Sequence, residues 1–158
     1  MATFARGDMD FKKDESDKLF DIPIANLSQP WQKGHARAAA NCWNEDDFKA
    51  SFSNYNYWPQ HKDLNMIYWK GLEEFLRTEA RQFERVFITS GAIYSDNDGK
   101  FVATYDDRAL IPQSFYKIAF FEQSDGTLKF SCWIMENSNK YQPHKKCLVS
   151  LIALENRT

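Results

Sequence analysis

The clearest pattern of apolar and polar positions lies between residues 63 and 85. Apolar side chains recur there at intervals of three and four residues with charges between them, which is the spacing of one buried helix face. These apolar positions are Leu64, Ile67, Tyr68, Leu72, Phe75, Leu76 and Ala80. Asp63 stands where an N-cap is expected. The pattern therefore predicts one long amphipathic helix over residues 63–85.

A second, shorter helix is predicted after Asn44. An asparagine is a favourable N-cap, and the three acidic residues that follow suit the positive end of a helix dipole. Phe48 supplies an apolar side chain to this helix, which we expect to end near Ser53.

Strands are predicted in the second half of the chain. Residues 86–89 are β-branched and aromatic, which favours a buried strand. Further strands are expected at residues 101–105, 110–121 and 128–135, with turns at residues 96–99 and 124–126 and a short closing helix within residues 147–155. Residues 1–27 are expected to be an irregular or edge-strand leading segment. This order predicts an α+β fold, with a single domain over residues 1–158.

Composition narrows the class of protein. The net charge is −2, so the basic excess typical of nucleic-acid binders is missing, although an enzyme that releases its product can use a local basic groove. The three cysteines form no Cys-x-x-Cys pair, which predicts reduced thiols and neither a disulfide framework nor a zinc site. No apolar run approaches the length of a membrane span, and no leader sequence is recognised. We therefore expect an intracellular protein with no membrane partner.

Candidate chemistry is concentrated around the start of the long helix. Residues 33–35 (Lys-Gly-His) precede it, Asn65 lies in its first turn, and Glu73 and Arg77 follow along it. Eight residues make a little over two turns, so Asn65 and Glu73 are expected on overlapping faces. Phosphodiester hydrolysis needs a base to activate water and a cation to stabilise charge on phosphate. An amide oxygen with a nearby carboxylate can hold a hard cation such as Mg²⁺.

These segments resemble the DNA/RNA non-specific endonuclease family, and are most similar to its mitochondrial endonuclease G branch. The family signature Asp-Arg-Gly-His is represented by residues 32–35 (Gln-Lys-Gly-His). The second element, Ser-Asn-x-x-Pro-Gln-x-x-x-Leu-Asn-x-x-x-Trp-x-x-Leu-Glu, aligns without gaps and matches at Asn56, Pro59, Gln60, Leu64, Asn65, Trp69, Leu72 and Glu73. Residues 86–91 resemble a family strand that ends in Thr-Gly-Pro, and residues 111–117 resemble its Val-Pro-x-x-Phe-Tyr-Lys strand.

The resemblance implies a ββα-metal fold, with a mostly antiparallel sheet and a long helix that carries the metal ligand. His35 is then the general base and Asn65 the sole direct protein ligand to Mg²⁺ or Mn²⁺. Glu73 would hold a water of the metal's hydration shell. The implied activity is hydrolysis of DNA and RNA with little sequence specificity, which leaves 5′-phosphate ends.

The remaining implied roles concern phosphate and the loop that carries the base. Lys33 stands where the family has an arginine that neutralises phosphate charge, and Arg77 offers a second cation. Asn56 is expected to support the His35 loop or the substrate. The resemblance also leaves a homodimer open, for which no residue marks an interface.

Several alternatives stay open at the level of sequence. Lysine lacks the bidentate fork of arginine, so phosphate binding is expected to be looser, and glutamine at position 32 replaces a carboxylate. The alternative function is therefore a catalytically weakened or inactive relative that binds nucleic acid or a protein. Glu73 and Arg77 could form a plain helix ion pair, and Asn65 could be a cap were Asp63 not better placed. Tyr57 and Trp58 could stack on bases, although packing under a loop is favoured.

Overall fold

The computed structural model describes residues 30–94, 104–105 and 109–158. The expected leading segment at residues 1–27, the expected turn at residues 96–99 and the first part of the strand expected at residues 101–105 lie outside this part of the chain. Within it, Thr104–Tyr105 (β4) pairs with Ala109–Leu110 (β5) in a short antiparallel ladder.

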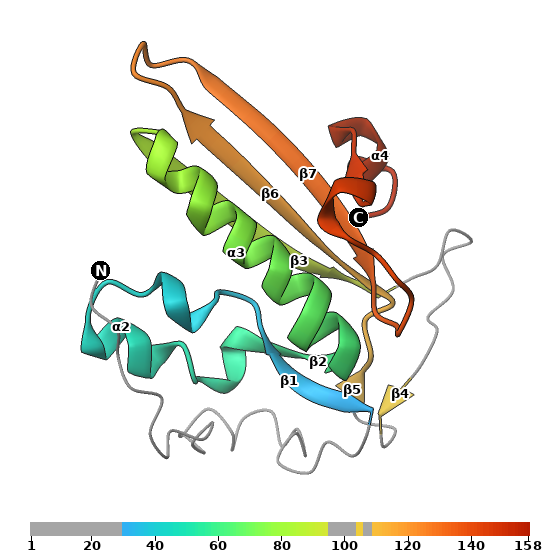
Figure 1. Ribbon diagram of the computed structural model, residues 1–158. Coiled ribbons are helices and arrows are strands. Elements are labelled where there is room, and N and C mark those ends of the chain that lie inside the picture. Colours follow the sequence, from blue (N-terminus) through green and yellow to red (C-terminus); the bar gives the residue numbers. More distant parts are fainter. Residues whose placement is uncertain (1–29, 95–103, 106–108) are drawn as a thin grey trace.

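The centre of the structure is an antiparallel sheet with the strand order β3-β6-β7-β8 (Figure 1). Its strands are Arg85–Ile93 (β3), Ser114–Glu122 (β6), Leu128–Glu136 (β7) and Leu148–Val149 (β8). The predicted turn between β6 and β7 is confirmed, because Gly126 adopts a φ of 80° there, which a side chain would strain. The strand predicted at residues 110–121 is broken in two around Pro112, which has no N–H to donate to a ladder.

The long helix is confirmed, with corrections at both ends. It contains a π-helical segment, η4 (Leu64–Trp69), the α-helix α3 (Lys70–Glu79) and a closing 3-10 turn, η5 (Ala80–Gln82). Arg85 belongs to β3, where its guanidinium pairs with Glu122 on the neighbouring strand. Asp63 has helical dihedral angles and makes no side-chain cap hydrogen bond, so the prediction that it is the N-cap is wrong.

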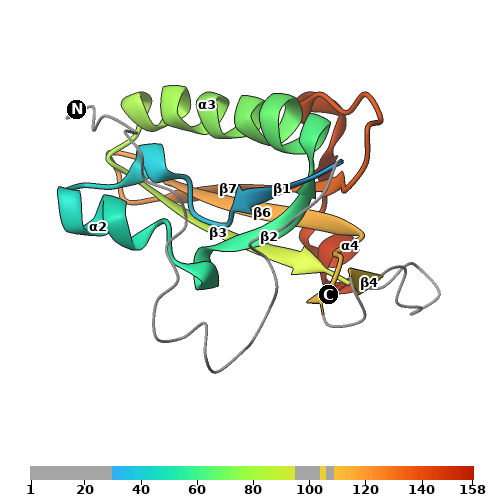
Figure 2. The same cartoon turned by 90° about the horizontal axis from the view of Figure 1, so that it is seen from below.

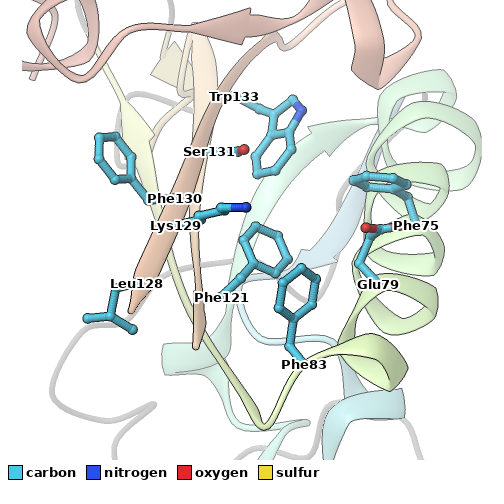
Figure 3. A pocket seen from close by; sticks show the side chains of 9 residues that line it. All are labelled: Phe75, Glu79, Phe83, Phe121, Leu128, Lys129, Phe130, Ser131 and Trp133. Carbon is cyan, nitrogen blue, oxygen red and sulfur yellow. The ribbon is translucent and has the colours of Figure 1, made fainter. Parts of the chain in front are cut away.

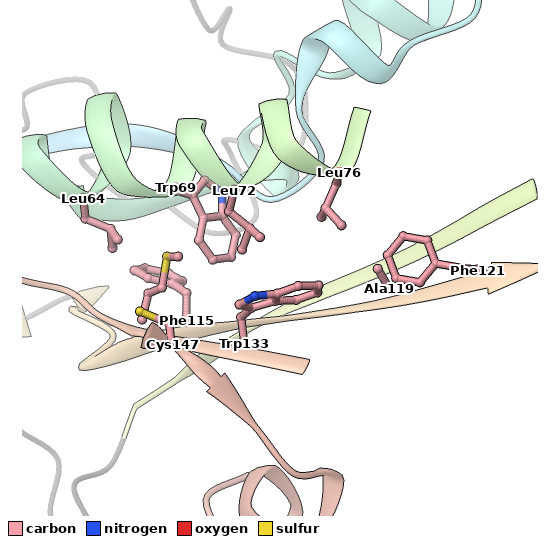
Figure 4. Packing of buried hydrophobic residues seen from close by; sticks show 10 residues of the cluster. Leu64, Trp69, Leu72, Leu76, Phe115, Ala119, Phe121, Trp133 and Cys147 are labelled. Carbon is pink, nitrogen blue, oxygen red and sulfur yellow. The ribbon is translucent and has the colours of Figure 1, made fainter. Parts of the chain in front are cut away.

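One face of the helix packs across the sheet, as Figure 2 shows. The buried side chains of this interface are Leu64, Trp69, Leu72, Leu76, Phe115, Ala119, Phe121, Trp133, Met135 and Cys147 (Figure 4). The helix contributes residues at the predicted intervals, and the strands contribute alternate residues of β6 and β7. Each large apolar side chain buried here stabilises the fold by roughly 1.5–3 kcal/mol.

The opposite face of the sheet is covered at one end by the short helix α4 (Leu151–Glu155). Ser150 caps α4 by accepting a hydrogen bond from the Ala153 N–H, and Leu154 packs in a second cluster with Ile93. The closing helix predicted within residues 147–155 is therefore confirmed for its second half, while its first half forms β8. The strand predicted at residues 86–89 is confirmed as part of β3, but the prediction that it is buried is wrong, because residues 87–89 are exposed and Phe87 is 51% exposed. The reason is that β3 is an edge strand of the sheet, and α4 reaches it only at its end, where Leu154 packs with Ile93.

A hairpin of two further strands stands before the long helix. Strand β1 (Trp31–His35) pairs antiparallel with β2 (Tyr57–His61), and β2 leads directly into the helix, which gives a ββα unit. The connection between the two strands contains η2 (Ala39–Asn41), α2 (Glu45–Ala50) and η3 (Asn54–Asn56). The side chain of Asn44 caps α2 as predicted, but α2 ends at Ala50, three residues earlier than expected.

No helix within the described ranges combines the length and the apolar character that crossing a bilayer needs.

The tight contact between β1 and β2 can be tested at Gly34. A Cβ at this position would lie 1.9 Å from Gln60 Oε1 and 2.2 Å from its Cδ, and Gln60 is fully buried, so it cannot swing aside. We expect Gly34→Ala to lower the free energy of unfolding by about 1–3 kcal/mol in urea titrations. The control is Gly71→Ala on α3, where no atom lies within 4 Å of the new Cβ and stability should hold or rise. If Gly34→Ala lowered the free energy of unfolding as much in the Gln60→Ala background as in wild type, this explanation would be contradicted.

Candidate active site

The ββα unit contains the residues of the first two sequence motifs. Cross-strand partners in an antiparallel pair face the same side. The register therefore places Lys33 and His35 on the side of Tyr57, and Gln32 and Gly34 on the side of Gln60. Consequently Gln32 lies on the side of β1 that meets the helix, and Lys33 and His35 lie on the other side of β1.

The amide of Gln32 contacts the first residues of the helix. Asn65 donates from Nδ2 to Gln32 Oε1 at 3.0 Å, and Gln32 Nε2 lies 3.4 Å from Met66 Sδ. The Asn65 side chain thus binds β1 and does not cap the helix. Gln32 stands where the family signature has a carboxylate, and it makes a direct contact with the predicted metal ligand.

The loop that follows His35 is held by Asn56. Asn56 Oδ1 accepts a hydrogen bond from the Arg37 N–H at 2.9 Å, and Nδ2 donates to the backbone oxygens of Arg37 and Ser51. The backbone N–H of Ala36 donates to the Asn56 carbonyl at 2.8 Å. These contacts match the loop-support alternative for Asn56. The ring of His35 packs edge-on against Phe52, with 5.1 Å between ring centroids.

Glu73 forms an ion pair that the sequence did not indicate. Its Oε1 lies 3.8 Å from the ammonium of Lys117 on β6, and the side chains are only 13% and 3% exposed. Lys117 Nζ also donates to Ser90 Oγ at 2.9 Å and lies 4.3 Å from the ring centroid of Trp69. Burial raises the pKa of Glu73, while the charges of Lys117 and Arg77 act to lower it. Burial lowers the pKa of Lys117 to about 8, against the opposing effect of Glu73.

The other two predicted cations, Arg77 and Lys33, make different contacts. Arg77 donates to Asn41 Oδ1 at 3.4 Å, so the helix ion pair between Glu73 and Arg77 that the sequence left open is replaced by Glu73–Lys117. The ammonium of Lys33 lies 5.6 Å from the ring centroid of Tyr57. Tyr57 is buried and Trp58 packs against Phe115, in agreement with the favoured packing alternative.

Two oxygens of the helix suit a hydrated divalent cation. Because its Nδ2 binds Gln32, Asn65 directs Oδ1 elsewhere, and no residue of the described ranges donates to that atom. Glu73 Oε1 is buried, and the Lys117 ammonium lies 3.8 Å from it, which is longer than a normal hydrogen bond. A π turn holds more residues than an α turn. Because residues 64–69 are π-helical, the eight residues from Asn65 to Glu73 make close to two whole turns, whereas in a regular α-helix they would make clearly more than two. The side chains of Asn65 and Glu73 therefore lie more directly above one another than they would in a regular α-helix. A protein amide and a carboxylate that binds water fit the preference of Mg²⁺ for oxygen ligands and retained waters.

A separate groove lies at the other end of the helix. Its volume is about 430 Å³, and it is lined mainly by aromatic rings, including those of Phe75, Phe83 and Phe121, together with Glu79 and Lys129 (Figure 3). Glu79 is the last residue of α3, whereas Asn65 lies in the first turn. The groove is therefore separate from the end of the helix that carries Asn65.

A sequence model of the DNA/RNA non-specific endonuclease family matches residues 4–158. The chain belongs to the DNA/RNA non-specific endonuclease family. Its resemblance to the endonuclease G branch, and with it the α+β fold of the ββα-metal type, is also confirmed.

Individual members of this endonuclease family show how far the similarity extends. Human mitochondrial endonuclease G is 25% identical over 95% of the chain and 54% of its own length. Nuclease C1 of Cunninghamella echinulata var. echinulata is 27% identical over 80% of the chain and 54% of its own length. The crystal structure of an EndoG/EndoGI complex matches with a TM-score of 0.76 and 25% identity, over 97% of this chain and 68% of the other. The chain thus spans about half the length of these curated relatives.

Two residues of this endonuclease-family site were not assigned a role from the sequence. Gln32 was noted as a departure from the signature, and Lys117 was noted as the last residue of a matching strand motif. A signal for Lys117 was present, because strand alternation puts it on the same face as Phe115 and Ala119, which are fully buried. A charged residue at an inward-facing position implies a buried partner.

The Lys117–Glu73 pair predicts a specific dependence of stability on pH. The unfolded chain keeps the Lys117 proton up to its ordinary pKa of 10.5, whereas the folded chain releases it near pH 8. The unfolded state therefore binds more protons between these values, so this residue makes the free energy of unfolding rise with pH. We expect the free energy of unfolding of the wild type, minus that of Lys117→Met, to increase by on the order of 3 kcal/mol from pH 8 to pH 10.5.

Urea titrations at several pH values measure this difference. The groups that face Lys117 are Glu73 and Arg77 on the helix and Ser90 on β3, and all three remain in the variant. Lys129→Met on the neighbouring strand is the control, because Lys129 is exposed. A plot of the free energy of unfolding of this variant against pH should run parallel to that of the wild type. Parallel curves for Lys117→Met as well would contradict the predicted proton release.

Proposed function

We propose that the protein is a metal-dependent endonuclease that hydrolyses phosphodiester bonds of DNA and RNA with little sequence specificity. Membership of the family and the names of its relatives support the nuclease activity. The observation that carries the metal dependence is the orientation of Asn65, whose Nδ2 is bound by Gln32 while Oδ1 accepts no hydrogen bond from any described residue.

His35 is proposed to be the general base. It would accept a proton from the attacking water, and its loop is held in place by the hydrogen bonds of Asn56. Lys33 would bind a phosphate oxygen from the same side of β1, because alternate residues of a strand face one side. Arg77 supplies a second positive charge along the helix. We expect the cleaved nucleic acid to carry 5′-phosphate ends.

Asn65 is proposed to be the direct protein ligand to Mg²⁺ or Mn²⁺. The bound cation would stabilise the charge that develops on the phosphate during hydrolysis. Glu73 would accept a hydrogen bond from a water of the hydration shell through its buried carboxylate oxygen. Lys117 offsets part of the cost of burying this carboxylate, since it supplies the opposite charge 3.8 Å away.

The proposed base is tested by cleavage of supercoiled plasmid with Mg²⁺, Mn²⁺ or EDTA. We expect cleavage to require metal and His35→Ala to lower the rate by about 10²–10⁴-fold, with the thermal midpoint unchanged. The matched control is His144→Ala, because His144 lies outside the ββα unit, where it stacks on Phe75 of α3, and the change should leave cleavage as in wild type. No cleavage by folded wild-type protein with either metal would favour the inactive relative that binds nucleic acid or a protein.

The role of Lys33 is tested by restoring the residue of the family signature. Arginine offers two parallel donors to a phosphate, whereas lysine offers a single point charge. We expect Lys33→Arg to lower the KM for plasmid cleavage several-fold while kcat changes little. An unchanged KM in a variant of wild-type stability would argue against a phosphate contact at this position.

A further inference from the structure

We propose that Gln32 is a positioning residue for the metal site, because its side-chain amide holds Asn65 in the orientation that offers Oδ1 to a divalent cation. This inference rests on the proposed role of Asn65 as the metal ligand. An asparagine that turns by half a rotation about its last side-chain bond would present Nδ2, which cannot bind a cation. The orientation of this amide therefore decides whether the site binds metal.

The two contacts of Gln32 fix the direction of both amides. Gln32 Oε1 accepts from Asn65 Nδ2 at 3.0 Å, and Gln32 Nε2 is directed at Met66 Sδ at 3.4 Å. Turning the Gln32 amide over would place two N–H donors against each other at Asn65 and would leave an oxygen against a sulfur that cannot donate. The thioether thus helps to set the orientation of Gln32, which in turn sets that of Asn65.

The backbone on both sides of this contact is held in place. Gln32 lies opposite Gln60 in the β1–β2 ladder, and the Lys62 N–H donates to the Pro30 carbonyl at 2.8 Å, which ties the start of β1 to the start of the helix. Asn65 and Met66 are consecutive residues of the π-helical segment. Gln32 therefore binds two adjacent side chains of a widened turn from a rigid strand.

A carboxamide is suited to this position because it both donates and accepts. Glutamate at position 32 would keep an acceptor for Asn65 but would lose the donor toward Met66. Methionine would keep a similar length and offer no acceptor of comparable strength. The pair Gln32→Glu and Gln32→Met therefore separates the acceptor function from the space that the side chain fills.

Calorimetric titration of the full chain with Mn²⁺ alone, without nucleic acid, tests the inference. We expect Gln32→Met to weaken Mn²⁺ binding by about 10-fold or more, within the range seen when partners of metal ligands are removed. Gln32→Glu should bind Mn²⁺ at least as well as wild type, because it keeps the acceptor and adds a negative charge. The thermal midpoint without metal should be similar in both variants. A Gln32→Met variant that binds Mn²⁺ like wild type would overturn the inference.

A double-mutant cycle provides the sharper test. In the Asn65→Asp background the ligand is a carboxylate, whose two oxygens can both bind a cation, so orientation by an acceptor is no longer needed. We therefore expect Gln32→Met to cost about 10-fold in Mn²⁺ affinity next to the native asparagine and close to nothing in that background. An equal loss in both backgrounds would show that Gln32 acts through stability alone, and would also overturn the inference.

The Asn65→Ala variant distinguishes failure of the inference from failure of the proposed function. Loss of Mn²⁺ binding in Asn65→Ala, together with wild-type binding in Gln32→Met, would keep the metal site and reject the positioning role. Wild-type Mn²⁺ binding in Asn65→Ala would reject Asn65 as the metal ligand, and with it the premise of the inference.

Discussion

The packing of the long helix across the central sheet determines where the candidate site residues lie. Trp69 and Leu72 are buried against the sheet, so neither the helix rotation nor its position along the sheet is free. Strand β2 runs into this helix without an intervening loop, and β1 pairs with β2 along five residues of register. The position of the Lys33–His35 segment relative to Asn65 therefore depends on an apolar interface that contains none of these residues.

The same interface contains a charge pair, which is costly in an otherwise apolar layer. Glu73 and Lys117 are both buried, and each loses hydration that their mutual attraction only partly restores. The opposite directions of their pKa shifts, both caused mainly by burial, express that cost. A buried carboxylate that is held in place by an opposite charge would be useful next to a hydrated cation. This gives a physical reason for a chain to retain a pair that apolar residues could replace.

Membership of the endonuclease family does not by itself explain how this particular chain uses its altered signature. Glutamine at position 32 removes a negative charge, but its amide reaches Asn65 and Met66 at the same time. Lysine at position 33 keeps a positive charge on the side of β1 that also bears His35. The departure at position 32 therefore exchanges a carboxylate for an amide that still offers an acceptor to Asn65, and the departure at position 33 keeps a cation.

The sequence by itself determined the amphipathic helix, the capped helix after Asn44, the β6–β7 hairpin and the family, because apolar spacing, caps and motifs are local properties of the chain. It did not predict the π turn at residues 64–69 or the exposure of β3, since both depend on what packs against them. The partners of Glu73 and Asn65 were also decided by tertiary structure. Lys117 and Gln32 lie 44 and 33 residues away along the chain. Contacts between distant side chains form only when the apolar core fixes the register of the helix against the sheet. The spacing of residues along the chain does not predict that register.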